Sequence, residues 1–128
     1  SDWAPVMVVH SFRVLVCGGR FFGDTALMFA TLDDINTDPS MGPITTIISG
    51  ACRGADRLAV MWAKSVGVPV EEYPANWGRY GKAAGPIRNL QMLKDGKPDL
   101  VVAFSGGHGT LHMMNAARDA GVRVLEVL

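Results

Sequence analysis

Short apolar runs alternate along the chain with longer stretches in which apolar residues recur with the period of a helix. The apolar runs lie at residues 12–17, 45–49, 68–73, from 100 onward and 122–128. Most are nearly continuous rather than alternating, which is typical of strands that are buried on both faces of a parallel sheet. The helical stretches run over about 24–35, 55–66, 86–96 and 110–121. The pattern therefore predicts an α/β protein.

Residues suited to helix ends support these boundaries. Asp24 is a good N-cap for the first helix, and Gly67 suits the left-handed position that follows the second. Residues 74–85 form a polar loop by composition, and Pro86 is placed at the first position of the third helix. In that helix the residues predicted to face the core are Ile87, Leu90 and Leu93, and Gly96 is its predicted end.

The alternation of strands and helices also predicts a topology. Right-handed crossovers place helices on both faces of the sheet, so we expect a Rossmann-like, doubly wound, mostly parallel five-stranded sheet in the order 3-2-1-4-5. Pro69 and the acidic pair Glu71-Glu72 suit a third strand at a sheet edge. Residues 12–128 are predicted to form a single domain, preceded at 1–11 by an N-terminal extension or an edge strand.

Composition narrows the classes of function. The 128 residues carry 12 basic and 12 acidic side chains, so the formal net charge is zero. This balance argues against a nucleic-acid partner held by a broad basic surface. No apolar run is long enough to span a bilayer, so no membrane partner is expected. Cys17 and Cys52 make no disulfide framework and are interpreted as reduced thiols, which favours a cytoplasmic location.

Two glycine turns follow the two strands that should flank the point where the strand order reverses. Ligands of doubly wound folds bind at such a point, and free N–H groups at the start of a helix attract anions, above all phosphate. Glycine also lets a ligand approach the backbone closely. The sequence therefore predicts a phosphate-binding site from the residues of both turns, which are Gly18, Gly19, Arg20, Ser105, Gly106, Gly107, His108, Gly109 and Thr110.

Further candidates lie near other predicted helix starts. Arginine forks suit phosphates and carboxylates, so Arg53 and Arg88 join Arg20 as candidate ligand-binding residues. Asp24 and Asp56 are most simply acids that complement a helix dipole, and contact with a ribose hydroxyl is the alternative for Asp24. The predicted set is completed by Gly50, in the turn after the second strand, and by Asn89, which follows Arg88 in the sequence.

Three other patterns in the sequence bear on the class of function. Neither glycine turn matches the dinucleotide-binding G-x-G-x-x-G, and no acidic residue closes a following strand as a ribose clamp, which argues against a dehydrogenase. His108 and His112 are four apart, but no third ligand accompanies them, so no metal and no cofactor is predicted. Trp77 and Tyr80 either stack on a base or pin their loop to the sheet.

Taken together, the motifs resemble a known family. They are Val-Leu-Val-Cys-Gly-Gly-Arg at 14–20, Gly-Ala-Cys-Arg-Gly-Ala-Asp at 50–56, Tyr-Pro-Ala-Asn-Trp at 73–77, Tyr-Gly-Lys-Ala-Ala-Gly-Pro-Ile-Arg-Asn at 80–89 and Phe-Ser-Gly-Gly-His-Gly-Thr at 104–110. In this order they resemble the YspA/YpsA-related branch of the SLOG superfamily. The resemblance implies a Rossmann-like fold that binds a nucleotide or a nucleotide-derived ligand, such as a derivative of NAD or ADP-ribose.

The resemblance extends to the LOG-type phosphoribohydrolases, with two departures. Their Pro-Gly-Gly-x-Gly-Thr-x-x-Glu motif is similar to residues 105–113, and Arg88 stands where their catalytic arginine is expected. Here Ser105 replaces the proline, and Leu111-His112-Met113 replaces the segment that should supply the glutamate. Such a hydrolase needs a carboxylate to stabilise the oxocarbenium-like state or to activate water. The resemblance therefore favours binding over that reaction.

Three functions follow from these observations. The first is a sensor or effector that binds a small nucleotide derivative at the paired glycine turns. The alternative is a nucleotide-processing hydrolase of the N-glycosidase or phosphoribohydrolase type, with Arg88 as the catalytic residue beside Asp24, Asp56 or His112. A single-stranded DNA module is a third, opposed by the zero net charge. The Met-rich helix after Thr110 is either a homodimer surface or ordinary core.

Overall fold

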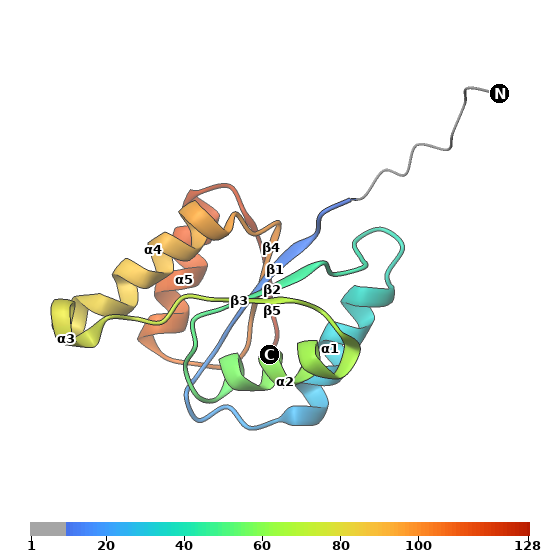
Figure 1. The fold of residues 1–128 in the computed structure, drawn as a ribbon, viewed down its shortest axis with the longest axis horizontal. Helices are drawn as coiled ribbons and strands as arrows, with labels where there is room; N and C mark the ends of the chain where they lie inside the picture. The colour runs from blue at the N-terminus through green and yellow to red at the C-terminus, as the bar shows by residue number, and fades with distance from the viewer. Residues whose placement is uncertain (1–9) are drawn as a thin grey trace.

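The computed structural model describes residues 10–128. Residues 1–9 of the predicted N-terminal extension or edge strand lie outside them, and residues 10 and 11 belong to no strand. Within the described residues, a five-stranded parallel sheet has the order β3-β2-β1-β4-β5, as predicted (Figure 1). The strands are β1 (Arg13–Cys17), β2 (Thr46–Ser49), β3 (Val70–Glu72), β4 (Leu100–Ala103) and β5 (Arg123–Glu126). The strand order reverses between β1 and β4, which are direct neighbours.

Helices cover both faces of the sheet. Figure 1 shows α1 (Thr25–Thr37) and α2 (Ala55–Val66) on one face, and α4 (Ala84–Gly96) and α5 (His108–Asp119) on the other. None of the helices between residues 10 and 128 has the length and apolarity needed to cross a membrane. The prediction of a Rossmann-like doubly wound fold is confirmed.

The central strand explains why the core has two halves. Successive side chains of a strand point to opposite faces, and β1 is apolar on both. Val14 and Val16 pack into the cluster that faces α1 and α2, whereas Leu15 and Cys17 pack into the cluster that faces α4 and α5. A continuously apolar strand is therefore what this position requires.

The stretch predicted as a loop at residues 74–85 is mostly helical, so that prediction is wrong. A short helix α3 (Trp77–Tyr80) begins after Asn76, whose side chain accepts a hydrogen bond from the Arg79 N–H, and a 3₁₀ turn (Gly81–Ala83) leads into α4. Pro86 is the third residue of α4 rather than its first. Proline is tolerated there because N–H groups in the first turn have no partner within the helix.

The buried face of α4 is also not the predicted one. Ile87 and Leu90 are 41% and 54% exposed, and only Leu93 of the predicted set packs partly against the core. Asn89 and Met92 are buried in their place. The helix is rotated so that a polar residue faces inward, which an apolar pattern cannot predict.

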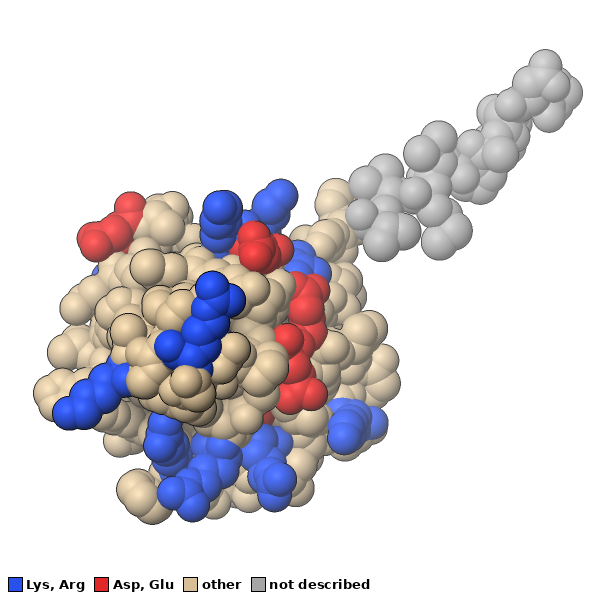
Figure 2. Space-filling model, turned by 60° about the vertical axis from the view of Figure 1, so that its left-hand side comes forward, with Lys and Arg blue, Asp and Glu red and all other residues tan. Residues whose placement is uncertain are grey.

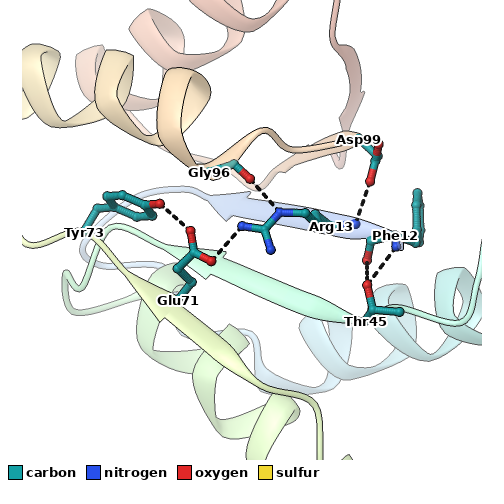
Figure 3. A network of polar contacts seen from close by, with 7 residues as sticks. All are labelled: Phe12, Arg13, Thr45, Glu71, Tyr73, Gly96 and Asp99. Atoms are coloured by element: carbon teal, nitrogen blue, oxygen red, sulfur yellow. Dashed lines mark hydrogen bonds and ion pairs between the residues drawn. The ribbon is translucent and has the colours of Figure 1, made fainter. Parts of the chain in front are cut away.

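A polar network ties the C-terminal end of α4 to the sheet (Figure 3). The guanidinium of Arg13 on β1 donates from Nε to the carbonyl of Gly96 at 2.6 Å and pairs through Nη2 with Glu71 on β3 at 2.7 Å. The hydroxyl of Tyr73 donates to the other oxygen of Glu71. One side chain of the central strand therefore fixes both the edge strand and α4.

We expect Arg13→Met to lower the free energy of unfolding by about 1–3 kcal/mol, because a charge-assisted hydrogen bond and an ion pair are lost together. Urea unfolding followed by circular dichroism measures this change. Arg118→Met is the matched control, because the Arg118–Glu126 pair spans 3.8 Å with both side chains about half exposed. Its loss should cost less than about 1 kcal/mol. Equal losses in the two variants would contradict the anchoring role of Arg13.

Candidate functional site

A cavity of about 990 Å³ opens at the carboxyl ends of β1 and β4. It brings together most of the residues that the sequence predicts for the site, which are Gly18, Gly19, Arg20, Arg88, Asn89, Ser105, Gly106, Gly107, His108, Gly109 and Thr110. Three predicted residues, Asp24, Gly50 and Arg53, do not line it. The two glycine turns therefore lie at one cavity, at the point where the strand order reverses.

The two turns are joined through their backbones. Beyond the strand ends, the N–H of Phe104 donates to the carbonyl of Cys17 and the N–H of Gly19 donates to the carbonyl of Ser105, both at 2.9 Å. A Cβ atom on Gly19 would lie 2.9 Å from that carbonyl oxygen, so the contact requires glycine. The amide of Gly19 is thus used within the protein and is not available to a ligand, unlike the role the sequence suggests for it.

The second turn keeps its amides free. The N–H groups of residues 106–110 have no acceptor among the described residues, and α5 starts at His108 without a side-chain cap. A Cβ atom on Gly106 would collide with the hydroxyl of Thr110, so glycine is required for that hydroxyl to sit there. The result is a run of donors at the positive end of a helix, the arrangement that binds anions.

Arg88 is held from several sides. Its Nη1 donates to the carbonyl of Gly50 and lies 3.4 Å from the carbonyl of Tyr73, and its Nε donates to Oδ1 of Asn89 at 3.0 Å. A Cβ atom on Gly50 would lie 2.7 Å from Nη1, so Gly50 acts by making room for the guanidinium rather than by lining the cavity. Among the described residues, Nη2 of Arg88 has no hydrogen-bond acceptor. Every buried side-chain nitrogen of these residues has a hydrogen-bond partner, so Nη2 is not buried and is accessible to a ligand.

Asn89 connects Arg88 with the first turns of α5. Because Oδ1 accepts from Arg88, Nδ2 is the atom that faces α5, where it donates to the carbonyl of Gly109 at 3.3 Å and lies 3.2 Å from Nδ1 of His112. This network makes Nδ1 of His112 the acceptor, which leaves the proton of a neutral ring on Nε2. His112, considered from the sequence as a metal ligand and as a candidate catalytic residue beside Arg88, also lines the cavity.

The site contains Asp56, a carboxylate that the sequence offers as a helix-dipole acid and as one of three candidates beside Arg88 in the hydrolase alternative. Asp56, the second residue of α2, is only 7% exposed and lines the cavity, and its Oδ2 accepts from the N–H of Cys52 at 3.2 Å. Burial raises the pKa of Asp56 to about 6, against the opposing effects of that hydrogen bond and of the Arg88 charge. Its position early in a helix matches a dipole-complementing acid equally well, so no separate signal in the sequence marks it as a site residue.

The residue at the position of the glutamate in the LOG-type phosphoribohydrolase motif does not line the cavity. Met113 stands there, and its side chain is fully buried in the cluster between α5 and the sheet. Among the described residues that line the cavity, Asp56 is the one acid. It shares the cavity with Cys17, whose pKa is raised to about 12 by burial, so this thiol stays protonated. No three His, Cys, Asp or Glu side chains of residues 10–128 gather to hold a metal ion.

Aromatic residues and basic groups form the outer wall. The Arg20 guanidinium lies over the ring of Trp77, 5.4 Å from its centroid, and both residues line the cavity with Phe21, which is 91% exposed. Figure 2 turns the α3 side forward and shows Lys and Arg spread over this face, whereas Asp and Glu gather mainly along one flank. The lining carries Arg20, Lys82 and Arg88 against Asp56, so it favours anions.

The other predicted residues have structural contacts. Asp24 is the N-cap of α1, where its carboxylate accepts from the N–H of Leu27 at 3.0 Å. The guanidinium of Arg53 lies 5.5 Å from the ring centroid of Phe21, and Arg53 faces a smaller neighbouring cavity. Tyr80 is covered by Arg79 and does not line the main cavity, unlike Trp77.

The buried acid predicts a pH-dependent stability. The pKa of Asp56 is raised from 3.8 to about 6 in the folded protein, so the folded state binds the proton of this carboxyl more tightly than the unfolded state does. The resulting stabilisation of the fold is complete below about pH 4 and is lost as pH rises through 6. We therefore expect Asp56→Asn to gain up to about 3 kcal/mol of unfolding free energy relative to the parent between pH 4 and pH 8. Urea unfolding at both pH values measures it.

Asp34→Asn, on the exposed face of α1, is the control and should show no such gain. If the difference in unfolding free energy between Asp56→Asn and the parent is the same at pH 4 and pH 8, Asp56 does not carry a buried, uncompensated charge.

Comparison with known proteins places the chain in a family. It is 36% identical over 121 residues to the Gene 61 protein of Mycobacterium phage D29, a match that covers 88% of this chain and 94% of that protein. The signal recognition particle receptor FtsY from Elizabethkingia anophelis, solved in complex with GDP, matches 98% of this chain with a TM-score of 0.44 and 17% identity. The chain spans 42% of that receptor, and nothing is concluded from so low a score.

The family match covers the first part of the site. A family model matches residues 12–80, a stretch that contains the first glycine turn, Asp56 and Trp77. This stretch is more than half of the chain, and the phage protein is similar over most of its length. The chain therefore belongs to the YspA, cpYpsA-related SLOG family.

Proposed function

We propose that the protein binds a nucleotide or a nucleotide-derived ligand in the main cavity, as a sensor or effector. The observation that carries the proposal is the run of unpaired amides at residues 106–110, which open with the Thr110 hydroxyl onto the same cavity as the accessible Nη2 of Arg88. Backbone donors at a helix start and an arginine fork are the two groups that most often hold a phosphate.

The rest of the cavity fits a larger ligand than phosphate. Its volume of about 990 Å³ is at the upper end of the range of small-molecule sites. Phe21, Phe22 and Trp77 line it, and aromatic rings of this kind stack on bases. Gly18 also lines the cavity, and a Cβ atom there would lie 2.6 Å from Cβ of Ala55. A phosphate on α5 with a base toward the aromatic residues therefore uses the whole cavity.

Hydrolysis of a nucleotide is the second candidate function. The observation that favours it is the pairing of Arg88 with a carboxyl of raised pKa in one cavity, an arrangement found at catalytic sites. Incubation with nucleoside monophosphates and chromatography of the products tests for free base. Release of base that is lost in an Arg88 variant would establish the hydrolase, and a lack of release would leave binding as the function.

We expect Arg88→Met to weaken AMP binding by about tenfold to a hundredfold, because the charge of Arg88 and the hydrogen bonding from its accessible Nη2 to the phosphate are lost. Isothermal titration calorimetry measures the affinity, and thermal shift extends it to GMP, NAD and ADP-ribose.

Lys94→Met, an exposed position in the last turn of α4, is the control and should bind AMP as the parent does. Circular dichroism checks that Arg88→Met remains folded, and Arg88→Lys should recover part of the affinity. No stabilisation of the parent by any of these nucleotides at millimolar concentration would reject the proposed function.

A further inference from the structure

Asp56 lies where a ligand's sugar would meet the protein. It follows β2 closely, and its side chain separates the main cavity from the smaller cavity of about 450 Å³, since it lines both together with Cys52. The phosphate-binding amides belong to α5 at the end of β4, so the two groups border the same cavity from different strands. A ligand whose phosphate rests on α5 can extend toward α2.

The hydrogen bonds of Asp56 are incomplete. A carboxylate accepts about four hydrogen bonds, and this one receives a single N–H, from Cys52 to Oδ2. Among residues 10–128, no group donates a hydrogen bond to Oδ1 of Asp56. Every buried side-chain oxygen of these residues has a hydrogen-bond partner, so Oδ1 is not fully buried and is accessible. Arg88 does not complete the set, because no Arg88 nitrogen lies within 4.0 Å of the carboxylate in the described residues. More than nine-tenths of Asp56 is buried, and the accessible Oδ1 can accept the missing hydrogen bonds from a molecule bound in the cavity.

The surroundings select the kind of donor. Arg20, Lys82 and Arg88 line the same cavity, so a ligand ammonium group would meet repulsion beside them. Neutral hydroxyl groups would meet no such repulsion. Two adjacent hydroxyls of a ribose can donate to one carboxylate, and an acidic residue accepts from a ribose hydroxyl in dinucleotide-binding folds. Asp56 differs from that acid in lying in the first turn of α2 rather than at the end of a strand.

We propose that Asp56 accepts hydrogen bonds from the vicinal hydroxyls of the ligand's ribose and makes the site select ribonucleotides over 2′-deoxyribonucleotides. This assignment rests on the proposed function, because it needs a nucleotide in the main cavity. It also replaces Asp24, the aspartate for which the sequence suggests ribose contact. Asp24 is occupied as the cap of α1 and does not line the cavity.

Titration calorimetry with AMP and 2′-deoxy-AMP, repeated with GMP and 2′-deoxy-GMP, tests the assignment. The parent protein should bind each ribonucleotide at least about tenfold more tightly than its deoxy counterpart, because the deoxy ligand leaves a buried acceptor unpaired. Asp56→Asn should bring the two affinities to within about threefold of each other, because the contact with the 2′-hydroxyl that distinguishes the two ligands is weakened. Asp24→Asn should keep the full preference.

The outcomes separate this inference from the proposed function. Equal binding of AMP and 2′-deoxy-AMP by the parent overturns the role of Asp56 and leaves nucleotide binding intact, and this comparison needs no variant to fold. A preference that survives in Asp56→Asn also overturns it. Absence of binding by all four nucleotides overturns the proposed function and the inference together. A merely structural role for Asp56 would change both affinities by the same factor and would leave their ratio unchanged.

Discussion

The hydrogen bonds that continue the β1–β4 pairing beyond the strand ends are the constraint on which the site depends. The bonds from Phe104 to Cys17 and from Gly19 to Ser105 hold two turns together that are more than eighty residues apart in the sequence. They use the Gly19 amide, so Gly19 contributes shape rather than a donor. The second turn is thereby fixed against the sheet with its own amides free.

Burial of polar groups near the cavity has a cost, which the fold meets for Arg88 and Asn89 by giving each of them several partners. Arg88 reaches the carbonyl of Gly50 and the side chain of Asn89, and Asn89 reaches α5. To bring Asn89 inward, α4 exposes Ile87 and Leu90, which would otherwise add to the core. The orientation of this helix is therefore determined by its polar residues as much as by its apolar ones.

The strands, their order and the main glycine turns could be predicted because each has a local cause. A run such as 12–17 is apolar on both faces, and Gly67 ends α2 in the left-handed conformation that glycine favours. The short helix α3 was not predictable from periodicity, since four residues are too few to show a period. The sequence could not single out Asp56 from Asp24 and His112 as the partner of Arg88, because the direction of its side chain depends on the packing of α2 against β1 and β2.

The room made by Gly50 for the Arg88 guanidinium has a consequence for how this family varies. A side chain at position 50 would occupy the place of Nη1, so it could not coexist with an arginine in this rotamer. The two positions lie on different parts of the chain, thirty-eight residues apart, yet they are sterically coupled. Relatives should therefore keep the glycine and the arginine together or lose them together, and a natural exchange at one site should be accompanied by an exchange at the other.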